Sequence, residues 1–92
     1  MPTIEIPTPL RPYANNQSVI AVSGATVKEV LTDLLTQYPD LEKHLKDRKG
    51  HVRSFVNIYL GDEDIRSLDG EDTEVESDDQ LIIIPSIAGG RI

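Results

Sequence analysis

Residues 26–38 read TVKEVLTDLLTQY, and this stretch decides the fold. Thr26 is placed to cap the first free amides of a helix, Glu29 completes a capping-box pattern, and Pro39 stops the helix. The apolar residues recur at the three- and four-residue spacing of one helix face: Val27, Val30, Leu31, Leu34, Leu35 and Tyr38. The stretch predicts an amphipathic helix whose apolar stripe must cover another layer.

Segments on both sides of this helix have the two-residue period of strands. Before it, residues 3–6 alternate with Ile4 and Ile6 inward, and we expect this strand to end near Leu10 because prolines at 7, 9 and 12 cannot donate to a sheet. A turn at Asn15 and Asn16 then leads to a hairpin return through residues 18–22. After the helix, a short turn is predicted over residues 40–46 and a strand over residues 54–60.

The last strand is the most apolar segment of the chain. Residues 61–79 are rich in turn formers and acids, with a short strand or turn expected around residues 65–68. Residues 81–84 are continuously apolar, which is typical of a central strand, and Pro85 ends them. This order predicts an α+β fold of the β-grasp type, with one main helix packed on a mixed four- to five-stranded sheet whose first and last strands lie side by side in parallel.

Composition limits what such a small domain can do. The chain has 92 residues, enough for one domain, and 16 Asp+Glu against 9 Lys+Arg give a net charge of −7. That charge argues against nucleic acid as a partner. The absence of cysteine excludes disulfides and thiol nucleophiles. With no signal segment or membrane-spanning apolar run in the sequence, we expect no membrane association and a cytoplasmic location.

The sequence shows no motif of an enzyme or a metal site. His44 and His51 lack a third ligand at a common metal spacing, so a structural or exposed role is expected for them. The acidic run in residues 71–79 lacks the residue order of a calcium loop and is interpreted as a solvated face, or else as a docking face for a basic partner. We therefore expect no metal and no cofactor bound by the chain.

The unusual feature is the segment after the last strand. We divide the chain into a β-grasp domain, residues 1–85, and a C-terminal arm that contains Ser86, Ile87, Ala88, Gly89 and Gly90, followed by Arg91 and Ile92. Two adjacent glycines make a narrow backbone, and six extended residues would reach about 20 Å, enough to enter another protein's site. The alternative is a frayed terminus, in which glycine is also common.

Over nearly its whole length the sequence resembles the ThiS/MoaD family of ubiquitin-like sulfur carriers. The resemblance rests on the helix of residues 26–38, the stretch FVNIYLGDEDIR at 55–66, the turn SDDQ at 77–80 and the ending LIIIPSIAGG at 81–90. Within the family, the NIY…DEDIR stretch and the IPSIAGG ending look most like the carriers used in cysteine synthesis. The resemblance implies that the chain is a carrier and co-substrate rather than an enzyme.

In this family, an ATP-dependent adenylating enzyme of the ubiquitin-activating type activates the terminal glycine carboxylate. The carboxylate becomes a thiocarboxylate that donates sulfur to a biosynthetic enzyme, here expected to serve cysteine or a related amino acid. By position that glycine is Gly90, but Arg91 and Ile92 follow it, so its carbonyl lies in a peptide bond. The resemblance therefore implies trimming by a protease, such as a metalloprotease of the JAMM type. ATP is then a substrate of the activating enzyme.

Strand alternation predicts a face for partner proteins. If Val56, Ile58, Leu60, Leu81 and Ile83 point to the helix, the opposite face of the sheet carries an apolar patch of Phe55, Tyr59, Ile82 and Ile84. A register shifted by one residue would exchange the two faces. Three alternative functions remain open: a small subunit of molybdopterin synthase, a ubiquitin-like protein modifier and a non-covalent interaction module.

Overall fold

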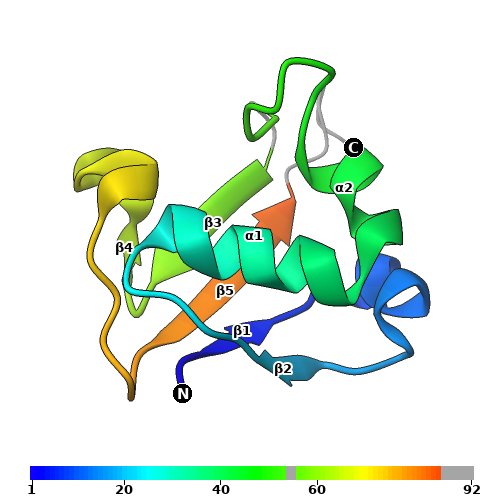
Figure 1. The fold of residues 1–92 in the computed structure, drawn as a ribbon, viewed down its shortest axis with the longest axis horizontal. Coiled ribbons are helices and arrows are strands. Elements are labelled where there is room, and N and C mark those ends of the chain that lie inside the picture. Colours follow the sequence, from blue (N-terminus) through cyan, green and yellow to red (C-terminus); the bar gives the residue numbers. More distant parts are fainter. Residues whose placement is uncertain (54–55, 86–92) are drawn as a thin grey trace.

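The computed structural model describes residues 1–53 and 56–85. A five-stranded mixed sheet has the strand order β2-β1-β5-β3-β4, and helix α1 (Val27–Gln37) crosses one face of it (Figure 1). The strands are β1 (Thr3–Glu5), β2 (Val19–Ala21), β3 (Val56–Leu60), β4 (Glu63–Asp64) and β5 (Gln80–Pro85). A 3-10 turn (Pro39–Leu41) and the short helix α2 (Glu42–Leu45) follow α1. The predicted α+β architecture is confirmed.

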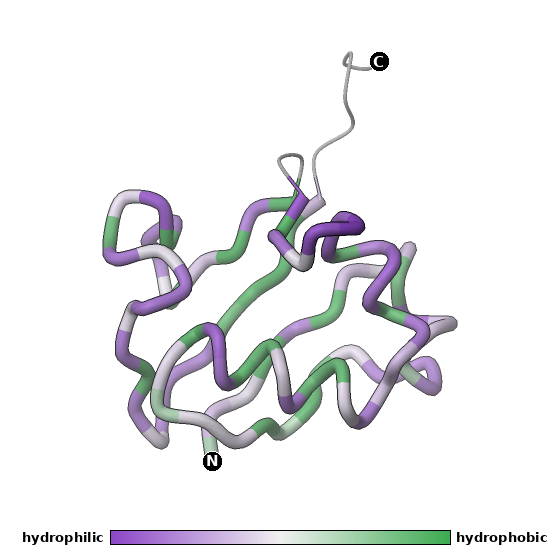
Figure 2. Tube along the Cα trace, turned by 45° about the horizontal axis from the view of Figure 1, so that its top comes forward, coloured by the Kyte–Doolittle hydropathy of each residue, from purple (hydrophilic) through white to green (hydrophobic). Residues whose placement is uncertain are grey.

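Strand β5 lies at the centre of the sheet, parallel to β1 and antiparallel to β3. Ile4 of β1 is opposite Leu81 of β5, and Ile58 of β3 is opposite Ile83 of β5. The side chains of these residues are buried beneath α1 together with Val30, Leu31 and Leu34 of the helix. Figure 2 shows β5 as a hydrophobic stretch, whereas the connecting segments are largely hydrophilic. The predicted central, parallel pair of first and last strands is therefore confirmed.

The start of α1 is capped at the residue that the sequence predicts. Thr26 Oγ1 accepts a hydrogen bond from the Glu29 amide at 3.2 Å. The Glu29 carboxylate reaches one residue further back than in a standard capping box, because it accepts from the Ala25 amide at 2.9 Å. An isolated bridge between Thr26 and Glu74 also ties the start of the helix to the acidic segment.

The first strand is shorter than predicted. It ends at Glu5, and residues Thr8–Ala14 form a 3-10 helix rather than an extension to Leu10. Proline fixes φ near the helical value and needs no donor at the first positions of a helix, so Pro9 can begin this turn as readily as it can end a strand. The 3-10 helix buries Leu10 and Ala14. The predicted turn follows, with positive φ at both asparagines.

The long segment between β3 and β5 contains short elements. Glu63 and Asp64 pair with Leu60 and Tyr59 as β4, and 3-10 turns follow at Ile65–Ser67 and Gly70–Asp72. The predicted short element around residues 65–68 is thus present, and Ile65 anchors it in the core.

Candidate functional site

The C-terminal arm continues from β5, and the sheet fixes where it begins. Pro85 pairs with Val56, the first residue of β3, so the arm starts at the end of the sheet where β3 begins. The predicted arm and processing residues lie outside the described residues: Ser86, Ile87, Ala88, Gly89, Gly90, Arg91 and Ile92.

The face of the sheet opposite α1 carries the predicted apolar side chains. On β5, Ile83 is 2% exposed on the helix side, whereas Ile84 is 43% exposed on the other side. Ile82 is half-buried and lies opposite Tyr59 on β3. We call Tyr59, Ile82 and Ile84 the outer patch. Its predicted register is confirmed for these three residues, while Phe55 lies outside the described residues.

A polar contact borders the outer patch. Asn57 lies opposite Ile84, and its Oδ1 accepts a hydrogen bond from the Arg66 guanidinium at 2.9 Å. The same guanidinium donates to the Val56 carbonyl at 2.7 Å, on the part of β3 that β4 does not pair with. Asp64 accepts from the Arg66 amide at 2.9 Å and holds that turn in place. Arg66 thus protects a stretch of strand edge that would otherwise be open to pairing with another chain.

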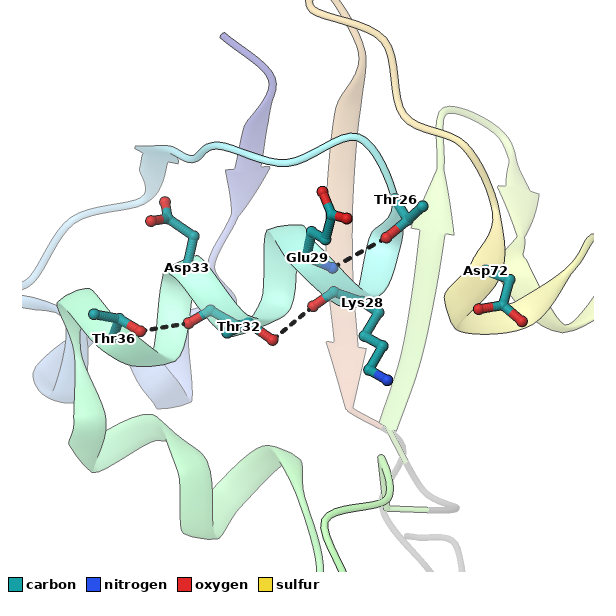
Figure 3. A pocket seen from close by; sticks show the side chains of 7 residues that line it. All are labelled: Thr26, Lys28, Glu29, Thr32, Asp33, Thr36 and Asp72. Atoms are coloured by element: carbon teal, nitrogen blue, oxygen red, sulfur yellow. Dashed lines mark hydrogen bonds between the residues drawn. The ribbon is translucent and has the colours of Figure 1, made fainter.

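A hollow of about 540 Å³ lies beside α1 (Figure 3). Two of its hydroxyls are engaged within the helix, since Thr32 donates to the Lys28 carbonyl at 2.9 Å and Thr36 donates to the Thr32 carbonyl at 2.8 Å. Asp33 accepts from the Ser23 amide at 3.0 Å, and Glu29 serves the cap. These contacts indicate that the lining residues stabilise α1 and the segment that leads into it.

The structure also locates the histidines and the acidic run. His44 stacks on Tyr13 with ring centroids 4.3 Å apart, and His51 lies on a separate hairpin. Asp72, Glu74, Glu76 and Asp78 are exposed. Within residues 1–53 and 56–85, no group of three or more His, Cys, Asp or Glu residues is placed to hold a metal ion. Across the same ranges, no helix is long and apolar enough to cross a membrane.

Comparison with known proteins identifies close relatives. The family model described as "ThiS family" matches residues 4–90. The sulfur carrier protein CysO of Mycobacterium tuberculosis is 39% identical over 90 residues, which cover 96% of this chain and 97% of that protein. In the structural comparison, its crystal structure has a TM-score of 0.87 at 36% identity and covers 95% of this chain and 100% of that one.

Two further relatives are a chain from a protein complex and an archaeal modifier protein. The crystal structure of the Amycolatopsis orientalis BexX/CysO complex contains a chain that matches with a TM-score of 0.88 at 33% identity, covering 98% of this chain and 100% of that one. The small archaeal modifier protein 3 of Haloferax volcanii is 33% identical over 66 residues, covering 72% of this chain and 71% of that protein.

Proposed function

The chain belongs to the ThiS family, and from that premise we propose that it is a sulfur carrier of cysteine biosynthesis whose sulfur is held as a thiocarboxylate at Gly90. The observation that carries this proposal is the 39% identity to a CysO sulfur carrier over 96% of the chain. The family match ends at residue 90, the second glycine of the arm. The arm follows directly on β5, whose last residue is Pro85, and this supports a terminus that is delivered to other proteins.

The proposed chemistry takes place on partner enzymes. A carboxylate oxygen of Gly90 attacks the α-phosphorus of ATP, and pyrophosphate leaves. Sulfide, or the terminal sulfur of a persulfide with a reductant, then replaces AMP at the acyl carbon and leaves a thiocarboxylate. The carrier contributes the terminus, the arm and a docking face, so we assign it the role of a co-substrate rather than a catalyst, with ATP bound by the activating enzyme.

Processing must come before activation. In the encoded chain the Gly90 carbonyl is in a peptide bond to Arg91, so it has no carboxylate to adenylate. We assign removal of Arg91 and Ile92 to a metalloprotease of the JAMM type. The two residues would then control when the carrier becomes active.

The outer patch is the proposed docking face for these enzymes. Tyr59 lies on β3, which begins beside the arm, and Ile82 and Ile84 lie on β5, which leads into it, so we expect a partner that covers them to be in reach of Gly90. Phe55, two residues before Asn57 on the same predicted face, is assigned to this surface by alternation.

Intact mass of the protein purified from its own cells tests the proposal. We expect a species that ends at Gly90, with a fraction carrying sulfur in place of one carboxylate oxygen. A Gly90→Ala chain from the same cells is the control. Full-length chain alone, under growth that demands sulfur assimilation, would contradict the proposal.

A ubiquitin-like protein modifier is the second candidate, favoured by the similarity to the archaeal modifier of Haloferax volcanii. In that case Gly90 would form an isopeptide bond with a lysine of another protein, and the mass analysis would show large adducts. A small subunit of molybdopterin synthase would use the same arm and would be distinguished by transfer of its sulfur to a pterin precursor.

A further inference from the structure

Opposite charges are segregated along the chain. Five of the 9 Lys+Arg lie in residues 43–53, and ten of the 16 Asp+Glu lie in residues 62–79. Strand β3 connects the two segments: the Val56 amide, at its start, donates to the Arg53 carbonyl, and Leu60, at its end, pairs with Glu63 of β4. The acidic segment then turns back along β3, where Glu71 lines a hollow together with His51 and Val52. Since Val56 also pairs with Pro85, the basic segment lies at the end of the sheet where the arm begins (Figure 1).

The basic segment contains an ordered hairpin, residues 46–52. Lys46 and Val52 form a bridge, and the Asp47 amide donates to the His51 carbonyl at 2.8 Å. The Asp47 carboxylate accepts from the amides of His51 at 3.0 Å and Lys49 at 2.9 Å. The hydrogen bond from the His51 amide holds the pKa of Asp47 below its ordinary value. Partial burial of the carboxylate opposes this shift, and the hydrogen bond from the Lys49 amide adds to it. The turn is therefore preorganised, with its exposed lysine and arginine side chains at the tip.

A hollow of about 480 Å³ separates this hairpin from α2. Arg53 belongs to its lining and donates through Nε to the Lys43 carbonyl at 3.1 Å. The Lys43 ammonium lies 6.0 Å above the Tyr13 ring, on which His44 also stacks. We call this the basic hollow, and its lining is Pro39, Asp40, Glu42, Lys43, Lys46, Asp47, Arg48 and Arg53.

We propose that the basic hollow and the hairpin tip bind carboxylates on the surface of the enzyme that receives the arm. This inference rests on the proposed function, because the binding surface is placed on the partner enzyme that takes up the arm. The five cationic side chains of the hollow and the tip, Lys43, Lys46, Arg48, Lys49 and Arg53, outnumber the three carboxylates of the lining, Asp40, Glu42 and Asp47, and they suit acidic side chains around the partner's entrance. The backbone of the hairpin is already ordered by its hydrogen bonds in the free protein, which lowers the entropy cost of binding.

The acidic residues of the chain affect how it can approach an acidic partner surface. With a net charge of −7, the chain as a whole is repelled by an acidic protein surface. An approach that leads with the basic hollow presents the segment with five of the nine cations, and it also leads with the end of β5 from which the arm continues. The lining of the basic hollow contains no carboxylate of residues 62–79, so an approach through the hollow does not place these carboxylates first against an acidic surface. Charge segregation thereby favours the productive orientation during encounter. The same net charge disfavours the phosphate backbone of nucleic acid, which extends beyond one small hollow.

The test measures association rates between the carrier and the adenylating enzyme of the same organism, for the full chain and for the chain ending at Gly90. One variant neutralises the hairpin through Lys46→Gln, Arg48→Gln and Lys49→Gln. A matched control changes the net charge equally, from −7 to −10, at the acidic end through Lys28→Gln, Ser77→Glu and Gln80→Glu. Thermal unfolding shows that each variant is folded before it is compared.

We expect the hairpin variant to associate about tenfold more slowly than the wild type at low salt, and the control to change less than about twofold. The difference should shrink at about 1 M salt, where the Debye length is about 3 Å. A short polyglutamate peptide should slow the wild type and leave the hairpin variant unchanged.

Equal slowing of both variants would overturn the proposal in favour of a net-charge effect, and unchanged rates for both would overturn it outright. Tight binding of the wild type to a DNA duplex at physiological salt, lost in the hairpin variant, would also overturn it in favour of nucleic acid. Failure of the proposed function is separate: the rates would differ as expected, but the chain ending at Gly90 would form no thiocarboxylate.

Discussion

Two neighbouring isoleucines of β5 should have opposite effects when each is shortened to alanine. Ile83 faces α1 and is 2% exposed, whereas Ile84 lies on the outer patch and is 43% exposed. Because successive side chains of a strand point to opposite faces, the two substitutions separate folding from partner binding within one strand. Both residues are isoleucines and adjacent in the sequence, so a difference between the two variants reports on the face of the sheet.

The magnitudes follow from burial. Ile83→Ala removes atoms from a filled core and should cost about 2–5 kcal/mol of the free energy of unfolding. Ile84→Ala should cost about 1 kcal/mol or less, because the side chain is only partly buried in the free protein. Full burial of an isoleucine is worth about 1.5–3 kcal/mol. Covering the exposed two-fifths of Ile84 in a complex is therefore worth about 1 kcal/mol, or about a fivefold change in Kd.

Urea unfolding and the binding of each variant to the adenylating enzyme measure the two effects. We expect Ile84→Ala to leave the unfolding midpoint near that of the wild type and to weaken binding about fivefold. Ile83→Ala should lower the midpoint strongly, and at temperatures where it remains folded it should bind normally. If Ile84→Ala destabilised the fold as much as Ile83→Ala, the register of β5 would be wrong. If it bound with unchanged Kd, the outer patch would not be the docking face.

Three further predictions concern the body that holds the site. Gly24→Ala should cost at least about 2 kcal/mol in urea unfolding, because φ is +151° and a Cβ would lie 2.7 Å from the Val30 amide nitrogen; Gly61→Ala, with φ +63° and open space, should cost about 1 kcal/mol, and equal costs would refute the steric reason. Thr26→Ala removes the acceptor of the Glu29 amide and should cost about 1 kcal/mol, lowering Tm by about 4–8 °C, whereas Thr26→Ser should restore most of it; an unchanged Tm would show that the cap is not needed. Folding lowers the pKa of Asp47, chiefly through the hydrogen bond from the His51 amide. Its carboxylate therefore stabilises the hairpin above the ordinary pKa of 3.8, and this stabilisation is lost as the pH falls through the folded pKa. NMR should show the Lys49 and His51 amide signals shifting together only below pH 3.8, and a shift above that pH would contradict the assignment.

The elements that the sequence predicted well are those whose period is local and whose ends are marked. For helix α1, the apolar stripe of residues 27–38, the threonine cap and the following proline all agree with the observed helix, whose C-cap is Tyr38. The first strand was predicted too long because Pro7 and Pro9 are compatible with both the end of a strand and the start of a 3-10 helix. Burial of Leu10 and Ala14, which depends on distant parts of the fold, decides between them.

Parts of the site were out of reach for the same reason. The contact between Arg66 and Asn57 joins residues nine apart, and it exists only because β4 turns the chain back along β3. The sequence predicts a short turn over residues 40–46, whereas the hairpin of residues 46–52 that follows it is seen only in the structure. A signal was present, because Asp47 followed by Gly50 is a common pattern for a turn in which an aspartate accepts backbone amides.

Strand β5 links stability and function in this fold. Its alternate residues Leu81 and Ile83 fill the core, Ile82 and Ile84 face outward, and its last residue leads into the arm. A slip of one residue in its pairing would exchange the two sets and would also move the start of the arm relative to the basic hollow. The parallel pairing with β1 on one side and the antiparallel pairing with β3 on the other therefore do more than stabilise the sheet. They hold the register that sets both the proposed docking face and the point at which the arm begins, so mutations that loosen this pairing should reduce sulfur transfer before they unfold the protein.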